Sequence, residues 1–239
     1  GVCIGLTSIR FALSGEFHLA IIAIIFAALI DGLDGRIARL IKGTSKVGKE
    51  LDSLTDMISF GVAPAFIMYF WKLNTFGRFG WLLCLVYVIC VALRLARFNI
   101  SSNQESSWRD NFFEGVPSPA GGILVLTPLI ISLSGFNYIK INYDIIVPIF
   151  FVATSFLLIS KIPTYSFKKI VIQRKATIFL LFAIVLFFGL LLIYTFNVIA
   201  ISSIIYLSLI PISFFHYQKM KKIHENDKIQ DEDDLEDVL

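Results

Sequence analysis

The sequence predicts an all-α membrane protein, a polytopic bundle of transmembrane helices. Hydrophobic residues make up 56% of the 239 positions and charged residues only 16%, and the mean hydropathy is +0.78. Long apolar runs recur along the chain, and a helix needs about 20 apolar residues to cross the hydrocarbon core of a bilayer. We therefore expect a lipid bilayer as the surroundings and no nucleic-acid partner.

About eight spans are expected, the first of them truncated. The run at residues 1–14 is too short to cross about 30 Å of hydrocarbon, so we interpret it as the end of a helix that starts before Gly1. Prolines at 64, 128, 148 and 211 are tolerated because membrane helices re-satisfy the freed carbonyl groups locally. The further spans are expected at 17–40, 52–71, 79–98, 119–134, 144–160, 177–195 and 198–215.

Two domains of unequal size follow from this pattern. Residues 1–217 form the transmembrane domain, and residues 218–239 form a charged tail, basic first and then acidic, which we expect to be disordered. Most of the 21 Lys and Arg residues fall in segments on one side, at 36–49, 94–109, 161–175 and 219–228. The positive-inside rule places that side, and the tail, in the cytoplasm of a multi-pass protein of the cell membrane.

Four aspartates interrupt the apolar pattern between residues 31 and 56. Charged groups are costly inside a membrane and usually mark a functional site there. If the helix that begins at Phe17 continues, offsets of three, four and seven residues share one face, and the residues on it are Asp31, Asp34, Gly35 and Ala38. Asp52 and Asp56 share a face of the next helix. Four carboxylates in one space need a compensating cation, and oxygen ligands favour Mg²⁺ or Mn²⁺.

The segment between the two pairs carries cations and turn-forming residues suited to a polyanionic substrate; they include Arg36, Arg39, Lys42, Ser45, Lys46 and Lys49. The spacing D-x2-D-G-x2-A-R-x8-G-x3-D-x3-D resembles the signature of the CDP-alcohol phosphotransferases. That resemblance implies displacement of CMP from a CDP-linked lipid by a hydroxyl, with two divalent cations, and a homodimer. It makes Asp31, Asp34, Asp52 and Asp56 metal ligands, Asp56 also the general base, and it makes Gly35, Ala38, Arg39 and Ser45 contacts of the CDP moiety.

A second constellation lies later in the chain. Arg94 and Arg97 share one helical face and would hold a phosphate or a carboxylate, although snorkelling to the interface also explains such arginines. After a polar loop, Pro119 suits the first turn of a helix, and Gly121 with Gly122 permits close helix approach. The motifs R-L-A-R-F-N and G-V-P-S-P-A resemble the phosphatidylserine synthase branch of the family, which implies CDP-diacylglycerol and L-serine as substrates.

Two other interpretations remain open at this stage. The acceptor would be glycerol 3-phosphate in a phosphatidylglycerophosphate synthase, or an inositol phosphate, and each of these would also use Arg94 and Arg97 for its phosphate. In a different class, four aspartates would line the path of a divalent-cation transporter. Against transport, all four lie at one cytoplasmic end, and no acidic residue lies in the midst of the later spans to continue a path.

Overall fold

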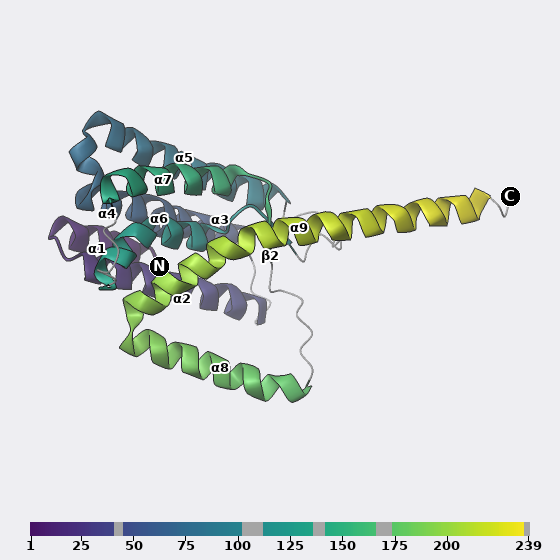
Figure 1. Cartoon of the computed structure of the whole chain (residues 1–239). Coiled ribbons are helices and arrows are strands. Elements are labelled where there is room, and N and C mark those ends of the chain that lie inside the picture. Colours follow the sequence, from purple (N-terminus) through teal and green to yellow (C-terminus); the bar gives the residue numbers. More distant parts are fainter. Residues whose placement is uncertain (41–44, 102–111, 136–141, 166–173, 237–239) are drawn as a thin grey trace.

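The computed structural model describes residues 1–40, 45–101, 112–135, 142–165 and 174–236, and side chains at 1–35, 37, 45, 47–100, 115–135, 142–164 and 177–220. These residues form a helical bundle with one short strand pair (Figure 1). In chain order the elements are α1 (Val2–Leu13), α2 (Phe17–Leu40), α3 (Lys46–Asp56), η1 (Met57–Val62), α4 (Ala63–Trp71), η2 (Leu73–Phe76), α5 (Arg78–Ser101), β1 (Phe112–Glu114), α6 (Ser118–Leu133), α7 (Tyr143–Ile159), β2 (Pro163–Tyr165), α8 (Arg174–Ile193) and α9 (Thr195–Glu236).

The expected all-α membrane fold is confirmed. Among the described residues, four helices are long and apolar enough to cross a membrane, at Phe17–Gly35, Val47–Trp71, Arg78–Ile100 and Thr195–Met220. The apolar helices between them are shorter and lie at Val2–Leu13, Ser118–Leu133, Tyr143–Ile159 and Thr177–Ile193. Exposed leucine, isoleucine and phenylalanine side chains occur on α2, α5, α7, α8 and α9, as a surface in contact with lipid tails requires. The total of eight spans stays a prediction.

One span differs from its expected boundaries in a way that matters for the site. The segment expected at 52–71 begins six residues earlier, because the Ser45 hydroxyl accepts a hydrogen bond from the Gly48 N–H and caps α3. Helix α3 then continues without a break through η1, a π-helical segment, into α4. A π-helical segment widens one turn and is often found at a functional site. Here it follows Asp56 directly.

The core lies where α1, α2, α4, η1, α5, α6 and α7 pack together. Close contacts at two glycines hold α6 against η1 and against α7. A Cβ atom on Gly122 of α6 would lie 3.2 Å from the Cβ of Phe60 in η1, and one on Gly121 would lie 2.8 Å from the Leu158 side chain of α7. The predicted close approach at these two glycines is confirmed. Pro119 occupies the first turn of α6, also as predicted.

A short antiparallel strand pair joins two loops at one end of the bundle. Strand β1 pairs with β2 in the register Phe112 to Tyr165, Phe113 to Thr164 and Glu114 to Pro163. The sequence analysis did not anticipate it, because three-residue strands leave no periodic pattern. The pair fixes the chain just before Gly115, whose φ of +76° and contact with the Ser160 carbonyl oxygen favour a residue without a side chain.

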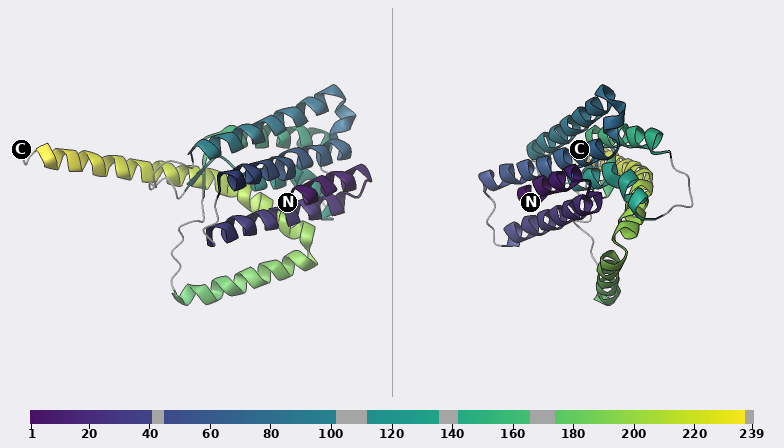
Figure 2. Two further views of the ribbon diagram at one scale, coloured as in Figure 1. Left: turned by 180° about the vertical axis from the view of Figure 1, so that it is seen from behind. Right: turned by 90° about the vertical axis from the view of Figure 1, so that its left-hand side faces the viewer.

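Helix α9 crosses the bundle and extends beyond it, while α8 lies to one side (Figures 1 and 2). The backbone of α9 stays helical to Glu236, and the disordered tail expected from residue 218 stays a prediction. The residues after Pro211 include neither proline nor glycine. These two residues are the strongest helix breakers, so neither of them ends the helix here. The division at residue 217 stays a prediction.

Candidate active site

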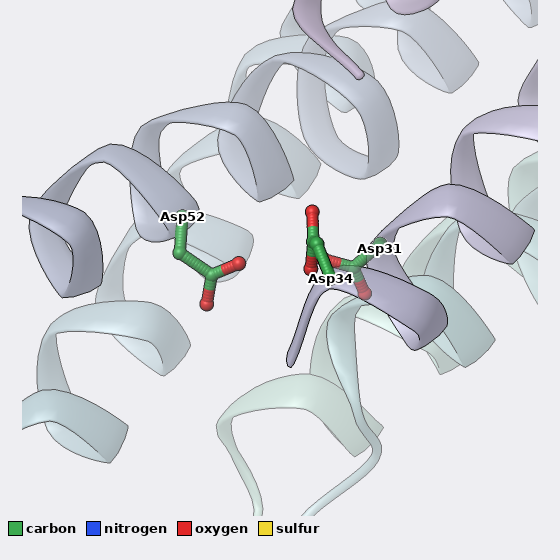
Figure 3. A group of neighbouring side chains, drawn as sticks. All are labelled: Asp31, Asp34 and Asp52. Atoms are coloured by element: carbon green, nitrogen blue, oxygen red, sulfur yellow. The ribbon is translucent and has the colours of Figure 1, made fainter. Parts of the chain in front are cut away.

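The two aspartate pairs approach one another from neighbouring helices, as Figure 3 shows for three of the four side chains. Asp31 and Asp34 lie near the end of α2, and Asp52 extends toward them from α3. One carboxylate oxygen from each of the three lies within 4.8 Å of the others. Asp31 is half-buried, whereas Asp34 and Asp52 are exposed. The group therefore combines a fixed inner carboxylate with two that a substrate in solution can reach.

Asp56 is the deepest of the four aspartates. It is 9% exposed, and its Oδ1 atom is buried without a hydrogen-bond partner among the described residues. Its carboxyl group also contacts that of Asp31, which joins the second pair to the first. A buried carboxyl oxygen that lacks a partner is costly, because its interactions with water have been lost without replacement. The geometry thus leaves one oxygen of Asp56 for a group that binds at the site.

Arg94 of α5 places a positive charge beside this acidic cluster. The residue is 9% exposed, and its guanidinium group interacts electrostatically with the carboxyl groups of Asp56 and Asp31. Its Nη1 donates a hydrogen bond to the Ser118 hydroxyl at the start of α6, and the group lies 5.6 Å from the centre of the Phe98 ring. The structure therefore brings R-L-A-R-F-N and G-V-P-S-P-A together beside the aspartates.

Arg97 has different partners from Arg94. Its Nη1 donates a hydrogen bond to the backbone carbonyl of Ile159, at a distance of 2.6 Å. Ile159 is the last residue of α7, where carbonyl groups lack partners within the helix. The guanidinium group of Arg97 therefore supports the end of α7. The two arginines have different partners in the structure, and their role in binding an acceptor or a phosphate stays a prediction.

Of the four residues expected to contact the CDP moiety, the structure describes Gly35 and Ser45 in full. A Cβ atom on Gly35 would meet nothing within 4 Å among the described atoms, so space lies beside the aspartate-bearing face of α2. Ser45 is exposed and caps α3 through its hydroxyl group, a structural role that the sequence analysis did not assign to it. The side chains of Ala38 and Arg39 lie outside the described residues.

A ring of hydrogen bonds that the sequence analysis missed fastens α3 to the end of α5. The Lys49 ammonium donates to the Asn99 carbonyl oxygen at 3.2 Å, and the Asn99 side-chain amide donates to the Ser53 hydroxyl at 2.9 Å. The Ser53 hydroxyl in turn donates to the Lys49 carbonyl oxygen at 3.2 Å. Ser53 follows Asp52 directly, so this ring fixes the turn of α3 that carries the carboxylate. The only signal in the sequence was the polar residue Asn99 at the end of an apolar span.

The donor set fits a divalent cation. Hard cations such as Mg²⁺ and Mn²⁺ prefer carboxylate oxygens, and ligands on opposite sides of one ion lie about 4–5 Å apart. The spacing of 4.8 Å or less between the oxygens of Asp31, Asp34 and Asp52 agrees with this. Only a few protein ligands are present, which leaves coordination positions for phosphate oxygens. The buried Oδ1 of Asp56 adds a further acceptor next to the group.

Comparisons with known proteins identify similar sequences. Residues 1–151 match the family described as CDP-alcohol phosphatidyltransferase. The chain is 44% identical over 165 residues to the CDP-diacylglycerol–serine O-phosphatidyltransferase of Mycobacterium leprae, covering 68% of this chain and 54% of that protein. It is 38% identical over 187 residues to the protein of the same name from Helicobacter pylori, covering 78% and 77%. For that of Bacillus subtilis the identity is 34% over 165 residues, covering 69% and 85%.

These alignments differ in how much of each relative they include. The chain spans about half the length of the mycobacterial protein and about three quarters of the Helicobacter pylori protein. The matched family region contains the four aspartates, Arg94 and Ser118, and it ends within α7. Helices α8 and α9 lie beyond it.

Proposed function

Because the chain belongs to the CDP-alcohol phosphatidyltransferase family, we propose that it transfers the phosphatidyl group of CDP-diacylglycerol to the hydroxyl group of L-serine. The products are phosphatidylserine and CMP, so the protein acts in phospholipid biosynthesis. The observation that carries the proposal is the convergence of Asp31, Asp34 and Asp52 within 4.8 Å, with buried Asp56 beside them. The choice of serine as acceptor rests on the names of the relatives.

Asp56 is the general base in this proposal. Its buried Oδ1 accepts the proton of the serine hydroxyl while that oxygen attacks the β-phosphorus of CDP-diacylglycerol. The new oxygen–phosphorus bond forms as the bond from the β-phosphorus to the oxygen of CMP breaks, and CMP leaves with that electron pair. The proton on Asp56 then passes to solvent or to the departing CMP, which restores the carboxylate.

Asp31, Asp34, Asp52 and Asp56 would hold the divalent cations, Mg²⁺ or Mn²⁺ and two in number. When bound, such ions neutralise the pyrophosphate charge and stabilise the leaving group. Gly35 leaves space for the CDP moiety beside α2, and Ala38, Arg39 and Ser45 complete its binding site. Arg94 contributes its positive charge from the other side of the cluster, where it interacts with Asp56. Arg97 holds the Ile159 carbonyl with Nη1, and its other N–H donors would serve the acceptor or a phosphate.

The membrane orientation follows from the distribution of charge. The aspartate site lies at the end of the bundle where α2 and α5 finish and α3 and α6 begin. In the sequence, lysine- and arginine-rich stretches fall at the ends of α2 and α5 and at the start of α3. The positive-inside rule places this end in the cytoplasm. Water-soluble serine and CMP would then enter and leave on that side, while the diacylglycerol part of the substrate stays in the cell membrane. The protein would act as a homodimer, as the family resemblance implies.

The direct test is release of CMP by the detergent-solubilised protein supplied with CDP-diacylglycerol and Mn²⁺ or Mg²⁺. Serine, glycerol 3-phosphate and inositol phosphate are offered separately, and serine alone is expected to stimulate release. Stimulation by another acceptor would keep the family and its aspartate site but refute the choice of serine. Absence of release with every acceptor, together with Mn²⁺ uptake into proteoliposomes, would favour the transporter.

A further inference from the structure

Tyr206 of α9 has a buried hydroxyl group that no feature of the fold explains. The phenol oxygen is inaccessible to water and has no hydrogen-bond partner among the described residues. The nearby Thr164 hydroxyl donates its own hydrogen to the Gly115 carbonyl oxygen at 2.8 Å, so toward the phenol it can act only as an acceptor. The ring itself packs against a small apolar cluster formed by Val116, Leu124 and Ile210. The apolar part of the side chain is therefore well accommodated, whereas its polar end is not.

The position of Tyr206 relative to Arg94 gives this hydroxyl a chemical context. The guanidinium group of Arg94 interacts electrostatically with the phenol of Tyr206 on one side and with Asp56 on the other. A guanidinium group has only donors, and a phenol beside it adds one O–H donor. The two side chains together present donors to whatever lies between them. A small anion satisfies both, and a carboxylate can accept from each with a separate oxygen.

We infer that Tyr206 and Arg94 bind the carboxylate of the amino-acid acceptor, so that α9 contributes a specificity-determining residue from outside the matched family region. This inference rests on the proposed function, because it assigns a binding site to the serine named there. An amino acid held at its carboxylate next to Arg94 has its side-chain hydroxyl directed toward Asp56, the group that interacts with the same arginine. Substrate orientation of this kind is what a transfer reaction requires.

The surroundings favour a small acid over the phosphate of a lipid. Ser118 is completely buried, Thr164 is 3% exposed, and Val116 and Leu124 close the same region from the apolar side. The exposed carboxylates Asp34 and Asp52 and the open space at Gly35 lie with the other part of the cluster, where the CDP moiety has room. The enclosed end therefore suits the smaller substrate.

Tyr206→Phe is the test, because it removes only the hydroxyl group and keeps the ring in its apolar cluster. The variant is expected to raise the KM for serine by about 10- to 100-fold, the loss typical of one hydrogen bond to a charged group. Its KM for CDP-diacylglycerol and its melting temperature should match those of the wild type. Tyr194→Phe, at an exposed tyrosine preceding α9, is the matched control and should change none of these values.

Two outcomes would overturn the inference. One is an unchanged KM for serine, as expected if the hydroxyl is merely a tolerated defect of packing; the other is a rise in the KM for CDP-diacylglycerol instead, which would assign the hydroxyl to the lipid phosphate. A second experiment replaces serine by serinol, an acceptor that lacks the carboxylate. The kcat/KM for serinol should be equal in the wild type and in Tyr206→Phe. An equal loss for both acceptors would also refute carboxylate binding. The wild-type acceptor assay reports separately on the proposed function.

Discussion

Replacement of Gly122 by alanine tests how closely α6 supports the catalytic helix. The added methyl group would lie 3.2 Å from the Cβ, 3.3 Å from the Cα and 3.3 Å from the carbonyl oxygen of Phe60. Phe60 belongs to η1 and follows Asp56 by four residues, about one helical turn. Two of the three contacted atoms are backbone, so a side-chain rotation cannot relieve the contact, and η1 and α6 must separate by a few tenths of an ångström.

The change in the free energy of unfolding caused by Gly122→Ala is the difference between two opposing effects. Overpacking of a well-filled core costs about 1–3 kcal/mol, and alanine in place of glycine within a helix returns about 0.5–1 kcal/mol. The midpoints of these two ranges give a net destabilisation of about 1 kcal/mol, which lowers the melting temperature in detergent by a few degrees. Asp56 directly precedes η1, so a shift of η1 also moves the Asp56 carboxylate. Rates depend steeply on the placement of reacting groups, and kcat for CMP release should therefore fall several-fold.

Gly189→Ala is the matched control for this prediction. Gly189 lies in α8, and a Cβ atom there would meet nothing within 4 Å among the described atoms. The same substitution should leave kcat unchanged and leave the melting temperature unchanged or slightly raised, because only helix propensity is altered. A Gly122→Ala protein that melts at or above the wild-type temperature would refute the reasoning about close packing at Phe60.

Three further substitutions address separate parts of the site. Asp31→Ala should weaken Mn²⁺ binding in calorimetry at least tenfold, because a half-buried carboxylate of the cluster is lost; an unchanged titration would remove Asp31 from the ligands. Asn99→Ala breaks the hydrogen bond to Ser53 and should destabilise the protein by about 1 kcal/mol while lowering kcat, and full activity would show that this ring does not position Asp52. Ser45→Ala should cost about 1 kcal/mol through the lost cap of α3, whereas Ser45→Asn, which caps equally well, should melt as the wild type does; equal losses in both would contradict the capping role.

Much of the fold could be predicted from the sequence because membrane helices leave a strong signal. The helix expected at 17–40 has those bounds in the structure, and the span expected at 79–98 lies within α5. The aspartates of the first pair meet Asp52 because helical spacing fixes which side chains share a face. Convergence of the two pairs needed only that the continuous segment α3–η1–α4 return alongside α2, which packs against η1 and α4.

The features that could not be predicted depend on contacts between distant segments. Arg94 and Arg97 looked equivalent in sequence, yet one faces Asp56 and the other binds the carbonyl of Ile159. The role of Tyr206 depends on where α9 crosses the bundle, which hydropathy does not determine. The tail is expected to be disordered because of its charge, whereas it contains neither proline nor glycine to end helix α9, and the two tendencies oppose each other.

The central claim, that Asp56 is the base in a metal-dependent phosphatidyl transfer, is tested most directly by Asp56→Asn. This substitution keeps the shape of the side chain and removes its ability to accept the proton. Loss of general base catalysis typically costs about 10²- to 10⁴-fold, so CMP release with serine should fall by that factor while CDP-diacylglycerol binding, measured separately by calorimetry, stays largely intact. Near-wild-type CMP release from Asp56→Asn would contradict the account.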